Sequence, residues 1–111
     1  LADRDLVASA KYHFIVAIEA CIDAANHIIS SERFRLPGDN TDSFRVLGDN
    51  GVVEEDSVTA LTAMARFRNR LVHLYWDVDD ELVRDYLETR LGDFDAFAER
   101  VSRFALDRPD E

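Results

Sequence analysis

The chain has little of the material that several protein classes require. Its single cysteine, Cys21, excludes an internal disulfide framework and fits a reducing cytoplasm. Two prolines and four glycines supply few of the tight turns that a many-stranded all-β fold needs. There is no signal peptide and no long uncharged apolar run, so we expect no segment to span or enter a membrane. These absences favour a small, helical, cytoplasmic protein.

Basic side chains are also scarce, because 13 Lys and Arg face 23 Asp and Glu, which gives a net charge of −10. A surface this acidic repels phosphate, so general nucleic-acid binding is disfavoured and we expect no DNA partner. The scarcity is uneven, since residues 57–76 carry three arginines and no acidic residue. Acid-free windows also occur by chance on buried helices, so the window gains weight only from the motif inside it.

The remaining composition is that of a globular protein, 47% hydrophobic and 32% charged over 111 residues. This length predicts one domain spanning residues 1–111. Because the chain begins at Leu1 rather than Met, we expect an N-terminal element to be missing.

Apolar residues recur at three- and four-residue steps in three long stretches, which is typical of helices. The first stretch runs from Asp3 to Ser30. A short helix capped by Thr41 follows, reaching about Leu47 and ended by Gly48 or Gly51. The expected inward face of the first helix comprises Val7, Phe14, Ile18, Cys21, Ala25 and Ile28.

The next helix is expected to begin with Asp56 as its N-cap, and the last one to run from Asp79 to Leu106 with a break or kink at Gly92. Together these elements predict an all-α up-and-down bundle of four to five helices. The expected inward faces are Ala60, Met64, Phe67, Leu71 and Leu74 on the one helix, and Leu87, Leu91, Phe94, Ala98, Val101 and Ala105 on the other.

The acid-free window contains an R-N-x-x-x-H-x-Y motif made by Arg68, Asn69, His73 and Tyr75. On an ideal helix, Asn69 and His73 point away from the core. Arg66 and Arg70 share that outer face and are candidate RNA or phosphate contacts, whereas Arg68 and Tyr75 lie on a flank.

Arg68 and His73 are five residues apart, so roughly 140° separates them on one helix. They reach the same phosphate only if the helix unwinds before His73 or if two copies of the protein meet. We favour a homodimer, in which each motif residue appears twice across one cleft.

Histidine can take a proton from a ribose 2′-OH and return one to the leaving oxygen, and arginine stabilises charge on phosphoryl oxygens. Asn69 could fix the tautomer of His73. This chemistry needs no metal or other cofactor, and His13, His27 and Cys21 lack the spacing of a zinc site. In the competing interpretation, Arg68 and Arg70 merely pair with surplus carboxylates.

The run from Phe67 to Asp79 resembles the HEPN superfamily, and specifically its HepT-like toxin branch, whose R-x4-H-x-Y pattern falls on Arg68, His73 and Tyr75. Residues 17–29 are similar to the first long helix of that branch, and residues 92–97 to its last. The resemblance implies an all-helical homodimer with Arg68, Asn69 and His73 at its interface. It also implies a metal-independent endoribonuclease toxin, silenced when an MntA-like nucleotidyltransferase antitoxin transfers AMP to Tyr75.

The sequence therefore predicts a cytoplasmic toxin that cleaves RNA. The alternative is a non-catalytic module whose arginine face docks a nucleotidyltransferase partner.

Overall fold

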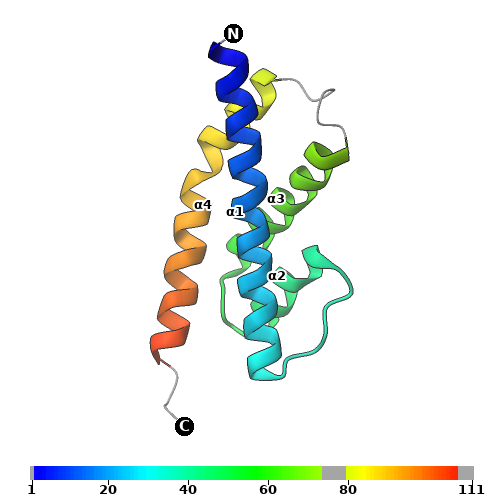
Figure 1. The fold of residues 1–111 in the computed structure, drawn as a ribbon. Coiled ribbons are helices and arrows are strands. Elements are labelled where there is room, and N and C mark those ends of the chain that lie inside the picture. The colour runs from blue at the N-terminus through cyan, green and yellow to red at the C-terminus, as the bar shows by residue number, and fades with distance from the viewer. Residues whose placement is uncertain (1, 74–79, 108–111) are drawn as a thin grey trace.

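The computed structural model of the protein describes residues 2–73 and 80–107, which form four helices without a strand. In Figure 1, α1 and α4 lie side by side and begin at the same end of the molecule, whereas α3 runs in the opposite direction. The short α2 packs on α1 and α3. The prediction of an all-α bundle is confirmed. The bounds are Ala2–Glu32 for α1, Asn40–Asp49 for α2, Glu55–His73 for α3 and Asp80–Asp107 for α4.

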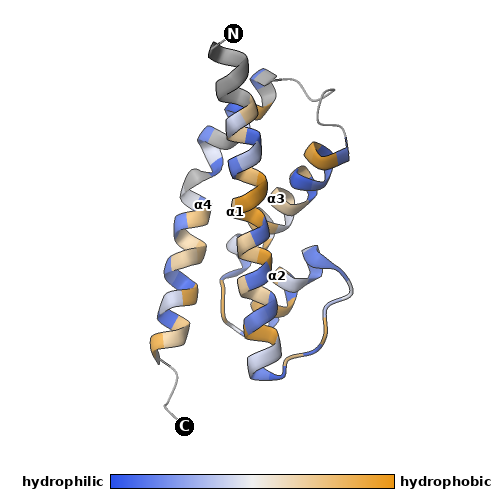
Figure 2. Ribbon diagram, viewed as in Figure 1, coloured by the Kyte–Doolittle hydropathy of each residue, from blue (hydrophilic) through white to orange (hydrophobic). Residues whose placement is uncertain are grey.

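α1 supplies an apolar face to the core, and in Figure 2 orange segments alternate with hydrophilic ones along this helix. Cys21 was expected on this face but is only half-buried, whereas its neighbour Ile22 is buried. Burial still raises the pKa of the Cys21 thiol to about 11, so the thiol stays neutral. The side chain of Val7 lies outside the described part of the chain. The buried residues of α1 include Phe14, Ile18, Ile22, Ala25, Ile28 and Ile29.

The segment Ala8–Glu32 of α1 is long and apolar enough to pass for a membrane span by length and composition alone. A core helix passes the same test. Here α1 packs on all three other helices, and 33% of that apolar window is buried inside the fold.

The start of α2 is set by Asp39, not by Thr41 as the sequence predicted. The Asp39 carboxylate accepts hydrogen bonds from the Asp42 backbone N–H and from the Thr41 hydroxyl, both at 2.8 Å. A carboxylate at this position satisfies a free N–H and favours the positive end of the helix. Thr41 therefore lies inside the first turn.

The sequence predicted that Gly48 or Gly51 ends α2. Gly48 does not, because the helix continues to Asp49. Its missing side chain instead lets α2 approach α3, since a methyl group at Gly48 would overlap Cγ2 of Val58. The chain leaves the helix at Gly51, whose φ of 73° is a conformation that glycine adopts readily. Of the two glycines predicted to end this helix, Gly51 is therefore the one at which the chain turns away.

α3 begins at Glu55, so Asp56 lies in its first turn rather than at its N-cap. Arg45 of α2 holds this end, because its two terminal nitrogens donate to the Glu55 carboxylate at 2.5 and 2.7 Å. The hydrogen bonds from Arg45 lower the pKa of Glu55. The predicted core face is largely confirmed, although Ala60 is half-buried and Leu74 lies outside the described residues. The buried residues of α3 are Val58, Leu61, Met64, Ala65, Phe67 and Leu71.

α4 is continuous through Gly92, so the predicted break is absent. The predicted inward face is wrong at two positions, because Ala98 and Ala105 are exposed, whereas Phe97 is buried and Phe104 is partly buried. Two phenylalanines bury more apolar area than two alanines, which fixes the rotation of the helix. Phe94 and Val101 pack against the core as expected, and the side chains of Leu87 and Leu91 are not described.

Candidate functional site

Two polar residues of the motif, Asn69 and His73, lie on the face of α3 opposite to its core residues. Asn69, Arg70 and His73 are exposed, as is Arg66 one turn before Arg70. This agrees with the orientation predicted from helical geometry. Tyr75 was predicted to be the modified residue and lies outside the described part of the chain.

Arg68 sits on the flank of α3 and is held by two partners. One terminal nitrogen, Nη2, forms an ion pair with the Glu19 carboxylate of α1, and the other, Nη1, donates to Oδ1 of Asn69 at 3.1 Å. The Arg68 side chain is 25% exposed, so it is oriented but still reachable from solvent. The pairing of Arg68 with a carboxylate, one of the two interpretations of the sequence, is therefore present.

Glu19 is a candidate site residue that the sequence did not reveal. It is separated from Arg68 by 49 residues, and no local pattern connects the two positions. The only signal is that Glu19 is the one charged residue in the otherwise apolar run from Phe14 to Ile22. The ion pair attaches the motif arginine to the longest helix of the fold.

Asn69 contacts Arg68 rather than the imidazole. No hydrogen bond joins Asn69 to His73 among the residues that the structure describes. In this arrangement Asn69 orients the guanidinium, and the prediction that it fixes the tautomer of His73 remains a prediction.

α3 stays helical up to and including His73. The first of the two sequence interpretations, in which the helix unwinds before His73, is therefore wrong. With a regular helix between them, Arg68 and His73 remain about 140° apart in direction. A single chain does not bring these two side chains to one phosphate through this helix.

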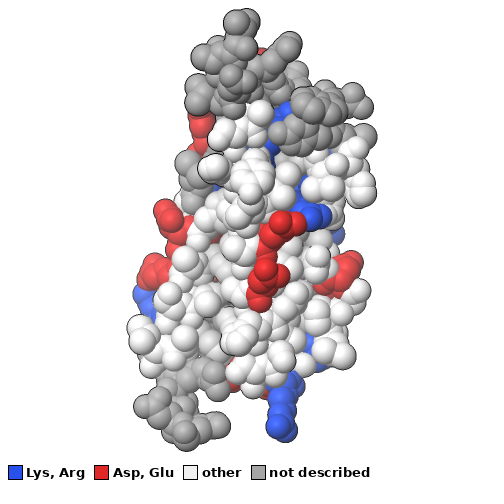
Figure 3. Space-filling view, in the orientation of Figure 1, with Lys and Arg blue, Asp and Glu red and all other residues white. Residues whose placement is uncertain are grey.

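The exposed face of α3 is locally positive on an acidic molecule. Neither Arg66 nor Arg70 forms an ion pair within the described part of the chain, whereas Arg35, Arg45 and Arg68 all do. On the face shown in Figure 3, basic groups occupy small separate areas among acidic and uncharged ones. Two uncompensated arginines near an exposed histidine can attract a phosphate at short range.

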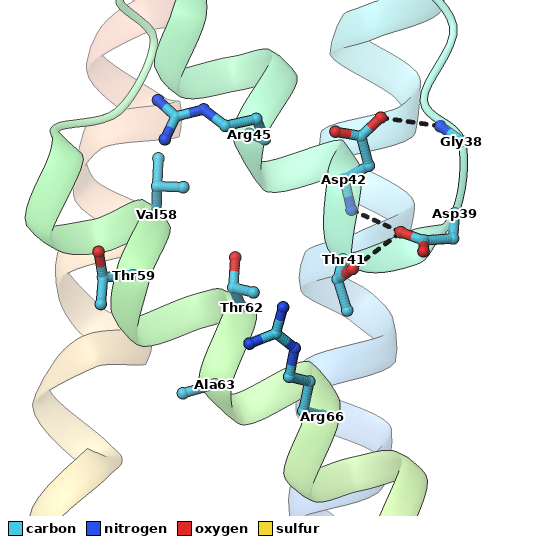
Figure 4. Close-up of a pocket in the computed structure, with 10 residues that line it drawn as sticks. All are labelled: Gly38, Asp39, Thr41, Asp42, Arg45, Val58, Thr59, Thr62, Ala63 and Arg66. Atoms are coloured by element: carbon cyan, nitrogen blue, oxygen red, sulfur yellow. Dashed lines mark hydrogen bonds between the residues drawn. The ribbon is translucent and has the colours of Figure 1, made fainter.

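A pocket of about 710 Å³ opens between α2 and α3 (Figure 4). It reaches the exposed face of α3 at Arg66, so it adjoins the positive region. Within residues 2–73 and 80–107, no group of three or more His, Cys, Asp or Glu is placed to hold a metal ion. The pocket is lined by Gly38, Asp39, Thr41, Asp42, Arg45, Val58, Thr59, Thr62, Ala63 and Arg66.

Known proteins are similar to this chain in both sequence and fold. A family model described as ribonuclease HepT-like matches residues 1–101. The chain is 33% identical over 83 residues to the mRNA nuclease HepT of Shewanella oneidensis, covering 75% of this chain and 62% of that protein. It therefore spans less than two thirds of the length of this relative.

Solved structures give the same result. A crystal structure of a toxin–antitoxin complex with AMP-PNP aligns with a TM-score of 0.81 at 29% identity, covering 87% of this chain and 74% of the other. A tri-AMPylated Shewanella oneidensis HEPN toxin in complex with MNT antitoxin aligns with a TM-score of 0.78 at 29% identity, covering 84% and 70%. The cytosolic Bacillus subtilis protein YutE shares the fold, with a TM-score of 0.81 at 22% identity over 92% and 73%.

Proposed function

The chain belongs to the HepT-like ribonuclease family, and we propose that it is the toxin of a toxin–antitoxin pair and acts as a metal-independent endoribonuclease in the cytoplasm. Its relatives support this proposal, because one is an mRNA nuclease and others are toxins in complexes with an antitoxin. Arg68, Asn69 and His73 are proposed to form the active site, and Arg66 and Arg70 to contact RNA.

The active site is proposed to be composite, with Arg68 from one protomer and His73 from the other of a homodimer. The observation that supports this most directly is the unbroken α3 helix between them, which aims the two side chains apart in one chain. A two-fold axis near the exposed face of α3 would place each histidine opposite the arginine of its partner.

The chemistry follows from the residue types. The His73 imidazole removes the proton from a ribose 2′-OH, and the 2′ oxygen attacks the adjacent phosphorus. The bond from phosphorus to the 5′ oxygen breaks, and that oxygen receives a proton from an imidazolium. The Arg68 guanidinium, held by Glu19 and Asn69, stabilises the charge that builds up on the phosphoryl oxygens.

The toxin is proposed to be silenced by an MntA-like nucleotidyltransferase antitoxin that transfers AMP to Tyr75. Relatives support the partner and the modification, because the complexes hold MntA or MNT antitoxin and one toxin is tri-AMPylated. Tyr75 follows His73 by two residues, so AMP on its hydroxyl would bring bulk and negative charge beside the proposed site. The arginines that substrate phosphate needs would then face a competing phosphate.

A second candidate function is a non-catalytic module that docks the nucleotidyltransferase through its arginine face. Two observations favour it: Arg68 is already paired with Glu19, and the net charge of −10 disfavours the approach of RNA. It predicts tight binding of the antitoxin without RNA cleavage.

The experiment that separates the two functions is an RNA cleavage assay with purified protein in EDTA. We expect fragments that carry a 2′,3′-cyclic phosphate, because attack by the 2′ oxygen leaves that end group. Cleavage that requires added divalent metal would contradict the proposed mechanism. No cleavage under any condition, together with binding of the antitoxin, would favour the docking module.

A Glu19→Gln variant tests whether the carboxylate positions Arg68. We expect kcat for RNA cleavage to fall about tenfold, which corresponds to about 1.4 kcal/mol of lost transition-state stabilisation. The neutral amide holds the guanidinium less firmly than a carboxylate. Kinetics on a defined oligonucleotide measure the effect, and Asp23→Asn, an exposed charge loss on the same helix, is the matched control. Equal activity of the two variants would remove Glu19 from the site.

A further inference from the structure

The pocket between α2 and α3, which we call the α2–α3 pocket, takes no part in the chemistry proposed above. Its size lies in the range of about 300–1,000 Å³ that is common for small-molecule sites. In Figure 4, Arg66 and Thr62 project from α3 toward the side chains of α2, and Thr41 faces them. Val58 and Ala63 add apolar surface to the wall formed by α3.

Four charged side chains line the pocket, and three of them are already engaged. Arg45 binds Glu55 and Asp49, Asp42 binds Arg35, and Asp39 caps α2. The hydrogen bonds from Arg35 lower the pKa of Asp42 to about 2, so this carboxylate keeps its charge and its partner. Arg66 is different, because it is exposed and forms no ion pair within the described part of the chain. Arg66 is therefore the cation of the pocket that stays available to a ligand, and it lies at the mouth, whereas Asp39 keeps a negative charge that no cation pairs with among the described residues.

Arg66 also connects the pocket to the proposed active site. It precedes His73 by seven residues, so the two side chains lie on the same face of α3, about 10.5 Å apart along the axis. At a stacked spacing of about 3.4 Å per nucleotide, that distance corresponds to about three nucleotides. One strand of RNA with a phosphate at His73 can therefore reach Arg66 with another.

We propose that the α2–α3 pocket is a substrate subsite that holds one nucleotide of the RNA away from the cleaved bond. Its phosphate lies on Arg66, its base packs against Val58 and Ala63, and the Thr62 hydroxyl hydrogen-bonds to it. This inference rests on the proposed ribonuclease function and adds a determinant of substrate length and sequence. A flanking nucleotide held in this way helps to position the scissile phosphate at His73.

RNA fits this pocket better than a protein segment does. The mixture of one free cation, hydroxyl groups and a small apolar patch matches a nucleotide, which combines phosphate, polar edges and a flat apolar face. A protein interface of standard size needs about 800 Å² from each partner and an apolar centre. The α2–α3 pocket offers mostly polar and charged side chains.

The test compares the shortest RNA that the wild type cuts with RNAs extended by four nucleotides on the 5′ or the 3′ side. We expect one of the two extensions to lower KM about ten- to a hundredfold, the usual effect of a hydrogen bond to a charged group. Arg66→Gln should lose this gain, because the flanking phosphate then finds no positive charge at the mouth of the pocket. Its slope of log KM against log salt should fall by about 0.7, the share of one phosphate on a single strand.

Thr62→Leu provides a second variant, because it fills the pocket and leaves Arg66 intact. It should lose the same gain from the extension. Arg84→Gln, an equal charge loss on the exposed face of α4, is the matched control and should keep the gain. Helical circular dichroism spectra establish that each variant is folded.

The possible failures are distinct. If the wild type cuts no RNA, the proposed function is wrong, whatever Arg66 does. If the wild type cuts RNA but Arg66→Gln and Thr62→Leu keep the full gain from the extension, the subsite is wrong and the ribonuclease proposal stands. If these variants cut RNA normally but release the antitoxin, the pocket binds protein and the subsite is again wrong.

Discussion

RNA cleavage by a His73→Ala variant is expected to be about a thousandfold slower than by the wild type, within the range of 10²–10⁴ that general acid–base catalysis contributes. His73 is exposed at the end of α3, so its loss removes the proton acceptor without opening a cavity in the core. Initial rates on a defined RNA in EDTA measure the effect. The helical spectrum and the thermal midpoint should match those of the wild type.

A mixture of variants tests the composite site. His73→Ala and Arg68→Ala are each expected to be inactive, but a mixed dimer contains one site with an intact arginine and an intact histidine. Random exchange makes half of the dimers mixed, with one working site of two, so about a quarter of wild-type activity should return. If no activity returns although mixed dimers form, both residues act within one chain. An unimpaired His73→Ala variant would contradict the mechanism altogether.

Incubation with the antitoxin, ATP and Mg²⁺ is expected to increase the intact mass of the wild-type chain by one or more AMP units, and that of a Tyr75→Phe variant by none. The phenol oxygen is the proposed acceptor, and phenylalanine keeps the ring without it. The same incubation should stop RNA cleavage by the wild type and leave the variant active. Intact-mass spectrometry and the cleavage assay give the two results on the same samples.

Tyr12→Phe is the matched control, since Tyr12 is 63% exposed on α1 and lies far along the chain from the motif. This variant should gain the same mass as the wild type. Modification of Tyr75→Phe would place the acceptor elsewhere. An unmodified wild type would leave the ribonuclease proposal intact and remove AMP transfer from the proposed regulation.

The spacing of apolar residues predicted the helices well where only one face of a helix carries enough apolar residues to be buried. It failed where two registers were possible, as on α4, because Phe97 and Phe104 outweigh alanines next to them only once the neighbouring helices are in place. The caps failed for a related reason. Asp39 and Thr41 both suit an N-cap, and tertiary contacts, not local preference, decide where the helix begins.

The outer face of α3 was predictable because direction on a helix follows from residue spacing alone, and Asn69, Arg70 and His73 are exposed as expected. The Glu19–Arg68 pair was not predictable in this way. It joins two helices whose relative rotation depends on the packing of the whole core. The α2–α3 pocket has the same origin, since its walls come from residues up to 28 positions apart.

The close approach of α2 and α3 at Gly48 restricts which substitutions related sequences can carry there. A side chain at this position is acceptable only if Val58 becomes smaller or α2 withdraws from α3, because the two atoms would otherwise overlap. Val58 also lines the α2–α3 pocket, so withdrawal would reshape that wall. Positions 48 and 58 are therefore expected to covary among related sequences, with glycine at the first wherever a β-branched residue occupies the second.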